Sequence, residues 1–182
     1  MTLNVQPSRP GVTAALIATL CLSQGAGLAS TSSSSLGARV VAYCEAHLGQ
    51  KVGSGECAAL AFQALKAARA KPRAGPDSPH RGDYVWGREV CRVEATADGP
   101  RRTGDFASVL PGDVMQYRDV RFVRFHADHH TAVVKSIDAA TGKVRAFAQN
   151  SGGRRFVVEL DVPLLNLSQG WIRIYRPIPT GH

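Results

Sequence analysis

The chain has 182 residues, a formal net charge of +8 at pH 7, 44% hydrophobic residues and 20% charged residues. This apolar content excludes a wholly disordered chain, and the glycines follow no three-residue period, which excludes collagen. The sequence has no internal repeat with a period of about 20 to 50 residues, which excludes a solenoid or a propeller. The length predicts one domain. The positive charge favours contact with polyanions of any kind and says nothing about the fold.

The N-terminal segment has the layout of a secretory signal peptide. Arg9 is the only charge before residue 39, and an apolar run follows it over 12–22. This run is shorter than the ~20 residues that span a bilayer, so no stable membrane anchor is expected after cleavage. Gly27-Leu28-Ala29 offers small residues for cleavage after position 29. We therefore predict a secreted or periplasmic protein with a signal peptide over 1–29 and a Ser/Thr-rich linker over 30–35.

Such a cleavage leaves three cysteines, namely Cys44, Cys57 and Cys91. In an oxidising compartment an odd number leaves at least one thiol free. We predict a disulfide between Cys44 and Cys91 and a free thiol at Cys57. Sequence alone does not determine this connectivity.

Two helices are predicted in the first part of the mature chain. Apolar residues recur at helical spacing from Leu36 to Leu48, and Gly49 is a stop signal, which predicts a helix over 36–48. A second series with spacings of three and four predicts a helix over 57–70. Cys57 therefore lies in the first turn of a helix.

The rest of the chain indicates an α+β domain. Residues 71–110 contain four prolines and many arginines, and we predict loops there with at most a short helix near 84–91. Beyond Pro111 the hydrophobic period changes to two, which predicts a mostly antiparallel sheet. We expect about five strands in this sheet, over 113–118, 130–138, 143–149, 155–161 and 171–176.

Cys57 is the candidate nucleophile. Unpaired N–H groups and the helix dipole favour a thiolate at a helix N-terminus, and a base must lie within hydrogen-bond reach. His130 begins the most strand-like stretch of the chain, and Gln149 and Asn150 end the next predicted strand. If these two strands form a hairpin, antiparallel pairing brings residues near 130 and 150 to the same end. Cys57, His130 and Asn150 then converge.

Four motifs occur in a characteristic order. They are Gly55-Glu56-Cys57 before an Ala/Leu-rich helix, Leu110-Pro111-Gly112-Asp113-Val114 before a strand, His130-Thr131-Ala132-Val133-Val134, and Gln149-Asn150 before a glycine turn. Together they resemble the CHAP family of cysteine, histidine-dependent amidohydrolases and peptidases. That family has a papain-like fold shared with NlpC-type peptidases. The resemblance covers about residues 36–176, and we expect a CHAP-like domain over 36–178.

The resemblance implies a bacterial enzyme that cleaves an amide bond in peptidoglycan, as an amidase or an endopeptidase. Cys57 would attack the carbonyl, N–H groups at the helix start would meet the oxyanion, and His130 would protonate the leaving amine. The reaction requires no metal or organic cofactor. We expect a monomer whose partner is a cell-wall polymer.

This chain departs from the family pattern at two positions. The family commonly has Gln before the nucleophile, where this chain has Glu56, and an acid at the third site, where this chain has Ala148. Orientation of the imidazole would then fall to an amide, either Asn150 or Gln149, which supplies no negative charge.

Alternatives remain open for several candidate residues. Cys57 also suits a buried core position. His129 is the functional equal of His130, and alternation along a strand puts the two on opposite faces. Tyr84 and Trp86, which with Glu56 are the candidate substrate-binding residues, either line a groove or fill the core.

Two further functions compete with a thiol hydrolase. His126, Asp128 and His129 are a candidate zinc site for metal-dependent hydrolysis. A catalytically lapsed module would instead use its basic surface to bind an anionic cell-wall polymer. The arginines between Lys66 and Arg102 are scattered among prolines and lack the ordered interleaving with aromatic residues of a single-strand groove, so we expect no nucleic-acid partner.

Overall fold

The computed structural model describes residues 34–72 and 83–181. The predicted signal peptide lies outside these residues, as do residues 30–33 of the predicted linker. No helix in the described part of the chain has the length and apolar character that a membrane span requires. The described elements, in chain order, are α1 (Leu36–Ala46), α2 (Cys57–Ala67), β1 (Arg88–Thr96), β2 (Gly99–Gly104), the 3-10 helix η1 (Phe106–Ser108), β3 (Val114–Phe122), β4 (Phe125–Asp138), β5 (Lys143–Ala148), β6 (Val158–Pro163), the 3-10 helix η2 (Leu164–Asn166) and β7 (Gln169–Arg176).

Both helices form where the apolar spacing predicts them. The Ser35 hydroxyl caps α1 by accepting a hydrogen bond from the Ala38 N–H at 3.2 Å, and α1 buries Val40 and Cys44. Helix α2 begins at Cys57 and buries its apolar stripe. The predicted helices over 36–48 and 57–70 are confirmed, each with an earlier end.

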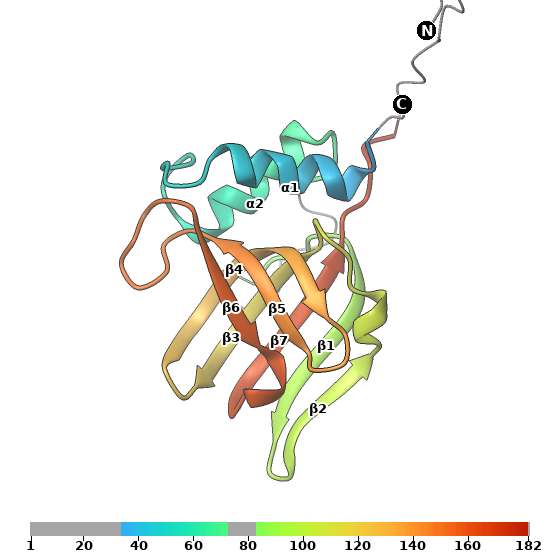
Figure 1. Ribbon diagram of the computed structural model, residues 1–182, viewed down its shortest axis with the longest axis vertical. Helices are drawn as coiled ribbons and strands as arrows, with labels where there is room; N and C mark the ends of the chain where they lie inside the picture. The colour runs from blue at the N-terminus through green and yellow to red at the C-terminus, as the bar shows by residue number, and fades with distance from the viewer. Residues whose placement is uncertain (1–33, 73–82, 182) are drawn as a thin grey trace, which may run out of the picture. The chain divides into compact units, whose positions relative to one another are not determined.

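All seven described strands belong to one sheet in the order β2-β1-β7-β3-β4-β5-β6, and every neighbouring pair is antiparallel. The predicted α+β class and antiparallel sheet are confirmed, with more strands than the five expected. In Figure 1 the two helices lie together at one side of the sheet. Helix α2 contacts β4, which brings Cys57 to the strand that carries the candidate histidines.

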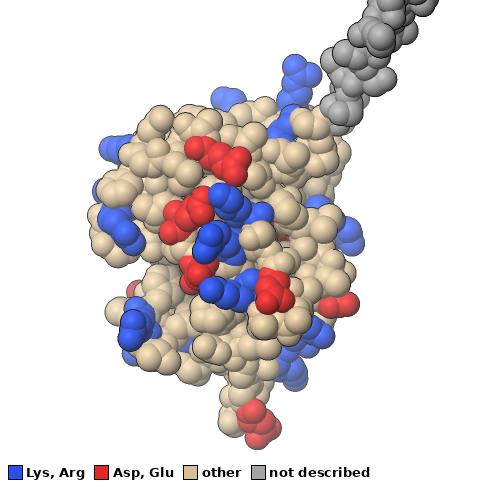
Figure 2. Space-filling model, viewed as in Figure 1, with Lys and Arg blue, Asp and Glu red and all other residues tan. Residues whose placement is uncertain are grey.

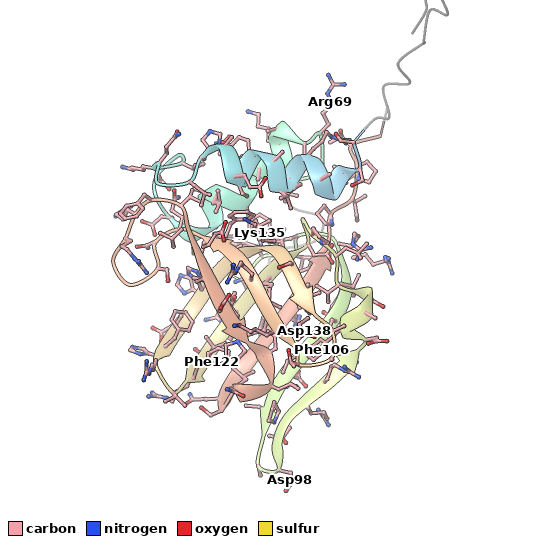
Figure 3. The ribbon with its side chains drawn as sticks, viewed as in Figure 1. Arg69, Asp98, Phe106, Phe122, Lys135 and Asp138 are labelled. Atoms are coloured by element: carbon pink, nitrogen blue, oxygen red, sulfur yellow. The ribbon has the colours of Figure 1, made fainter. Side chains whose placement is uncertain are left out.

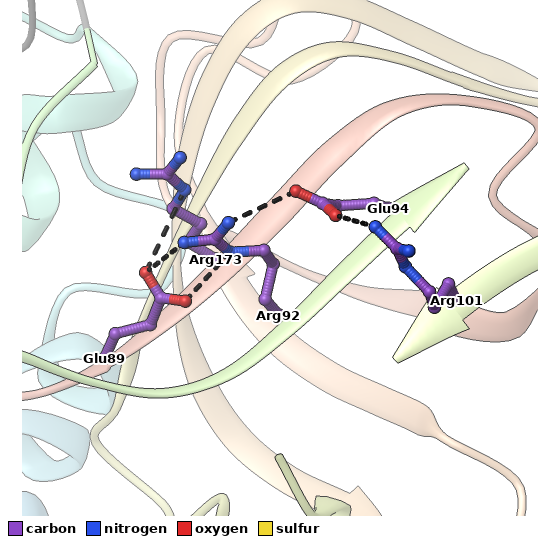
Figure 4. Close-up of polar contacts among 5 residues, drawn as sticks. All are labelled: Glu89, Arg92, Glu94, Arg101 and Arg173. Carbon is purple, nitrogen blue, oxygen red and sulfur yellow. Dashed lines mark hydrogen bonds and ion pairs between the residues drawn. The ribbon is translucent and has the colours of Figure 1, made fainter. Parts of the chain in front are cut away.

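The prediction of loops over 71–110 is wrong for the part that forms β1 and β2. These strands form a hairpin, and β1 pairs with β7. Cys91 and Val93 alternate with charged residues and are buried, so a period of two was present in the sequence. Figure 4 shows why the arginines are compatible with strands, because Glu89 and Glu94 pair with arginines of β1, β2 and β7.

Two hydrophobic cores lie on opposite faces of the sheet. Cys44 belongs to the core between the helices and the sheet, and Cys91 belongs to the core on the other face, which includes residues of both 3-10 helices. The described cysteines are all free thiols. The predicted Cys44–Cys91 disulfide is therefore wrong, because the sheet separates two residues whose Cβ atoms would have to lie within about 4.5 Å.

The motif around Gly112 joins α1 to the sheet. Gly112 has φ +88°, and a Cβ there would lie 2.5 Å from the Cα of Gly37 in α1. The next residue, Asp113, is 1% exposed, and its carboxylate accepts hydrogen bonds from Arg176 and from the Leu110 N–H. This motif fixes the position of a helix and a strand end without contributing a group to the thiol site.

Candidate functional site

Cys57 is the first residue of α2 and is partly exposed. Burial raises the pKa of its thiol above the ordinary value. Hydrogen bonds from the main chain of Thr131 and Ala58 and from the Thr131 hydroxyl oppose that rise, and the charge of Glu56 adds to it. Of these main-chain groups, the one from Ala58 belongs to the helix start and the one from Thr131 belongs to β4. Their effect is smaller than the cost of burying a thiolate, so the thiol stays protonated at neutral pH.

His130 is one residue away from the position on β4 that faces Cys57. Side chains of β4 alternate between the two faces, with Val133 in the core beneath the helices and Ala132 in the opposite core. His130 shares the face of Ala132, where its ring lies edge-on to Tyr117 with a centroid distance of 5.5 Å. The structure does not bring the predicted nucleophile and base together.

The surroundings of His130 are unusual for a general base. The side chain is 5% exposed, and its Nε2 has no hydrogen-bond partner within the described residues. Burial lowers the pKa of His130 to about 4, and the neighbouring His129 contributes to the shift. The imidazole is therefore neutral at pH 7.

Thr131 occupies the position beside Cys57. Its hydroxyl donates to Gln116 Oε1 at 3.1 Å, and the same oxygen accepts from the Trp86 indole at 2.9 Å. Trp86 is 1% exposed and is part of the core beneath the helices. Tyr84 is half-buried and contacts the Trp86 ring edge-on. Of the two aromatic candidates for substrate binding, Trp86 fills the core and Tyr84 remains partly accessible.

Gln149 holds the loop before α2 and does not orient a histidine. Its Oε1 accepts from the Val52 N–H, and its amide nitrogen donates to the carbonyl oxygens of Val52 and Glu56. Both amide hydrogens are therefore used. The side chain is fully buried, so these bonds are central to the position of the loop.

Asn150 is directed at Glu56. Its amide nitrogen donates to Glu56 Oε2 at 2.8 Å, and the other carboxylate oxygen of Glu56 pairs with Arg155. Asn150 has φ +58°, a left-handed conformation that suits Asn before a glycine turn. The predicted third member of the site thus lies beside the cysteine helix, where it contacts an exposed acid.

A cleft of about 400 Å³ opens along the start of α2. Its walls combine apolar groups from α2 and the segment before β1 with polar groups from the loop before α2. The lining residues are Gly53, Ser54, Glu56, Ala58, Ala59, Phe62, Gln63, Tyr84 and Trp86. Two of the residues that flank Cys57 along the chain, Glu56 and Ala58, are among them. Phe62 and Gln63 carry no motif that sequence analysis would have singled out.

The structure does not support the predicted zinc site. Within the described ranges, no group of three or more His, Cys, Asp or Glu side chains could hold a metal ion. His126, Asp128 and His129 lie along one strand, where successive side chains diverge. His129, the alternative base, is exposed and pairs in register with Arg118 of β3.

This geometry, a cysteine at a helix start packed on an antiparallel sheet, agrees with the comparison with known families. A model described as the AIM3/BBC1 cysteine proteinase-fold domain matches residues 26–182. The chain belongs to this family. A papain-like fold is therefore shown, whereas membership of the CHAP or NlpC families is not.

Among curated proteins, the chain resembles the "Altered inheritance of mitochondria protein 3" of the yeast Debaryomyces hansenii, with 29% identity over 157 residues. The matched region is 80% of this chain and 16% of that protein, so the AIM3/BBC1 domain spans only a small part of its relative. The source differs from the bacterial origin that the CHAP resemblance implies.

Two solved structures of Ly7917 are also similar. One covers 78% of this chain and 62% of the other, with a TM-score of 0.48 and 16% identity. The second, titled as a complex with the hydrolyzing product of MDP, covers 76% and 62%, with a TM-score of 0.46 and 18% identity.

Proposed function

We propose that this chain is a binding module that keeps the cysteine proteinase fold and lacks its hydrolytic chemistry. The observation that carries the proposal is the identity of the β4 residue beside Cys57. Thr131 lies there, and a threonine hydroxyl does not accept a proton from a thiol at neutral pH. His130 points from the opposite face of the sheet, where it has aromatic neighbours.

The raised pKa of Cys57 supports the same conclusion. The thiolate is the nucleophilic form, and hydrolysis at neutral pH requires a lowered pKa or an adjacent base. Burial works against the first requirement, and Thr131 does not meet the second. The polar side chains that would orient a base have other partners, since Gln149 bonds to the main chain and Asn150 to Glu56.

The ligand site in this proposal is the cleft along α2. Phe62 is 36% exposed and Tyr84 is half-buried, so both present apolar surface, while Gln63 and Ser54 supply hydrogen-bonding groups. A cleft of this kind suits an extended peptide, which offers main-chain donors and acceptors together with apolar side chains. The peptide would be held beside Cys57 and released intact.

Thiol reactivity tests the proposal directly. The rate of Cys57 alkylation by iodoacetamide, followed over pH by peptide mass spectrometry, should rise in a single step. The apparent pKa of this step should lie at or above the ~8.5 of an ordinary thiol. His130→Ala should leave that profile unchanged. Thr131→His, which places an imidazole beside the sulfur, should add a faster limb at lower pH. His substitution at the exposed Thr141 is the matched control and should add none.

The opposite outcome would restore the enzyme that the sequence predicts. A wild-type limb well below the ordinary thiol pKa that disappears in His130→Ala would establish an activated Cys57–His130 pair. Amidase or endopeptidase action on peptidoglycan would then be the function to assay. The binding proposal would be withdrawn.

On the face formed by β4, β5 and β6, the charge distribution does not provide a continuous basic surface for an anionic ligand. Lys135 pairs with Glu45 and Glu159, and Asp161 pairs with two basic residues of β5. Figure 2 shows acidic and basic side chains interleaved across this face. An electrostatic binder of an anionic polymer would lose affinity steeply between about 50 and 200 mM salt, whereas binding in the cleft should change little.

Secretion and a cell-wall ligand remain predictions from the sequence. Cleavage after Ala29 would give a mature chain that begins at Ser30. The intact mass of protein recovered outside cells that express the whole chain tests this prediction. An uncleaved chain found only inside the cells would contradict it.

A further inference from the structure

A second cavity lies on the face of the sheet opposite Cys57. It has a volume of about 330 Å³ and is bounded by the β3–β4 hairpin on one side and by β6 on the other. Its walls include Tyr117, Phe122, Phe125 and Leu160. Figure 3 labels Phe122, which lies at the end of this hairpin. The volume is at the lower end of the range for ligand pockets, which suits a molecule of one or two rings.

The cavity contains one buried polar atom that the protein leaves unsatisfied. His130 is 5% exposed and lines the cavity, and its Nε2 has no hydrogen-bond partner among the described residues. A buried polar group without a partner is uncommon in folded proteins and calls for an explanation, such as a bound molecule. The ring also makes edge-to-face contacts with Tyr117 and Phe125, at centroid distances of 5.5 and 6.1 Å.

The groups around His130 determine which class of ligand the cavity can bind. Its low pKa keeps the imidazole neutral at pH 7, so it offers no charge to a buried anion. Arg124 and Asp161 also line the cavity, but Arg124 is exposed and the Asp161 carboxylate pairs with Lys143 and Arg145, so neither offers a buried, unpaired charge to a ligand. A neutral hydroxyl both donates and accepts, so it pairs with Nε2 in either tautomer of the ring. Aromatic walls favour an aromatic ring over an aliphatic one, through edge-to-face contacts.

We propose that this cavity binds a small phenol-type molecule, whose ring contacts Tyr117, Phe122 and Phe125 and whose hydroxyl pairs with Nε2 of His130. This site is separate from the cleft beside Cys57 and does not depend on whether that cleft binds or cleaves peptides. In this assignment His130 serves recognition in place of general base catalysis.

The probes are p-cresol and toluene, which differ by the hydroxyl group. Titration of the full chain, followed by NMR of the ¹⁵N-labelled imidazoles, should show p-cresol binding roughly tenfold more tightly than toluene, as expected for one recovered hydrogen bond. The ¹⁵N shift of His130 Nε2 should move with p-cresol and not with toluene. This shift needs no variant and therefore does not depend on a substituted protein folding.

Variants distinguish binding in the cavity from non-specific binding elsewhere on the protein. Leu160→Trp fills the cavity and should abolish binding of both probes. Leu48→Trp is the matched control, because Leu48 is 41% exposed and lies just after α1, and binding should be unchanged. His130→Phe should keep toluene binding and remove the preference for p-cresol.

Three results with these two probes would overturn the proposal. They are no binding at millimolar concentration, equal affinity for both probes in the wild-type protein, and binding that survives Leu160→Trp. Tighter binding of N-acetyltyrosinamide than of p-cresol would also overturn it, because the occupant would then be a tyrosine side chain of a protein and not a small molecule.

Discussion

Gln149 and Val52 are joined by two hydrogen bonds that run in opposite directions. The Gln149 Oε1 accepts from the Val52 N–H at 2.7 Å, and its Nε2 donates to the Val52 carbonyl oxygen at 2.9 Å. The second hydrogen on Nε2 donates to the carbonyl oxygen of Glu56 at 2.9 Å. The buried amide thereby bonds to the main chain of Val52 and Glu56 as a neighbouring strand would, and it holds the loop that leads into α2 and its cysteine.

Gln149→Ala should lower the free energy of unfolding by about 2–5 kcal/mol, because it removes three hydrogen bonds and leaves the buried Val52 N–H without a partner. The carbonyl oxygens of Val52 and Glu56 keep their bonds from the N–H groups of Gly55 and Ala59. Urea unfolding measures this loss. Gln50→Ala is the control, since Gln50 is exposed and makes one side-chain bond at 3.3 Å. That change should cost no more than about 0.5 kcal/mol. Equal costs for the two variants would contradict the role given to Gln149.

Thr131→Val should raise the pKa of Cys57 further, because the Thr131 hydroxyl stabilises the thiolate when it turns its one hydrogen from Gln116 Oε1 to the sulfur. Alkylation of Cys57 at pH near its ordinary pKa should therefore be slower than in the wild-type protein. The variant should also lose about 1 kcal/mol of stability with the bond to Gln116. Thr180→Val, which removes an exposed hydroxyl bonded to the Arg69 carbonyl, should not change the rate. A faster reaction in Thr131→Val would refute this account.

Arg176→Gln should cost about 3–5 kcal/mol at pH 7, because it leaves the Asp113 carboxylate buried without its counter-ion. Burial raises the pKa of Asp113, and Arg176 opposes that rise. Without the arginine the folded-state pKa rises further above the unfolded value, so the variant gains relative stability as the pH falls through that pKa and the carboxyl takes up its proton.

Unfolding measured from pH 7 down to pH 4 should therefore show a shrinking penalty for Arg176→Gln. Arg145→Gln breaks an exposed pair with Asp161 and should leave the stability almost unchanged. A penalty for Arg176→Gln that grows as the pH falls would contradict the assignment.

His130 should make the wild-type protein sensitive to acid. Its pKa is about 4 in the folded protein, below the ordinary value of about 6.5, so the folded state binds fewer protons. The stability contributed by the neutral ring is present above the unfolded pKa and is lost as the pH falls from about 6.5 to about 4. The wild-type protein should lose up to ~3 kcal/mol more over this range than His130→Phe.

Both proteins contain Asp113, so its contribution to the pH dependence of the free energy of unfolding cancels when the wild-type protein is compared with His130→Phe. NMR titration of the His130 ring protons gives an independent measurement, with an expected midpoint of about 4. A midpoint near 6.5 would mean that the ring is open to solvent, and the cavity proposal would then lose its buried anchor.

Local sequence patterns predicted the helices and strands in which one face is apolar and the other is polar. The helices followed from apolar spacing, and the hairpin of β4 and β5 followed from the change to a period of two. The hairpin of β1 and β2 was hidden because its arginines and Pro100 resemble a loop. Its strand character comes from the buried Cys91 and Val93, which alternate with charged residues, and from pairing with β7, which lies far along the chain.

The site was harder to predict because it depends on which residues of β4 point toward the helices and which point to the opposite face. A shift of one residue exchanges the two faces of a strand, and this is the difference between His130 and Thr131. Which of the two faces the helices is set by packing of the whole sheet on α2, and no local motif reports it. The roles of Gln149 and Asn150 were likewise assigned by position, whereas their partners are loop residues.

The order of the strands has a consequence for aggregation. The sheet has two open borders, β2 and β6, where main-chain groups could template the addition of a foreign strand. Pro100 and Arg101 lie on the first border, and Glu159, Asp161 and Pro163 lie on the second. Proline and charge at both borders discourage intermolecular sheets. A domain protected in this way can be carried within a much longer polypeptide, as in its yeast relative, without recruiting neighbouring chains during synthesis.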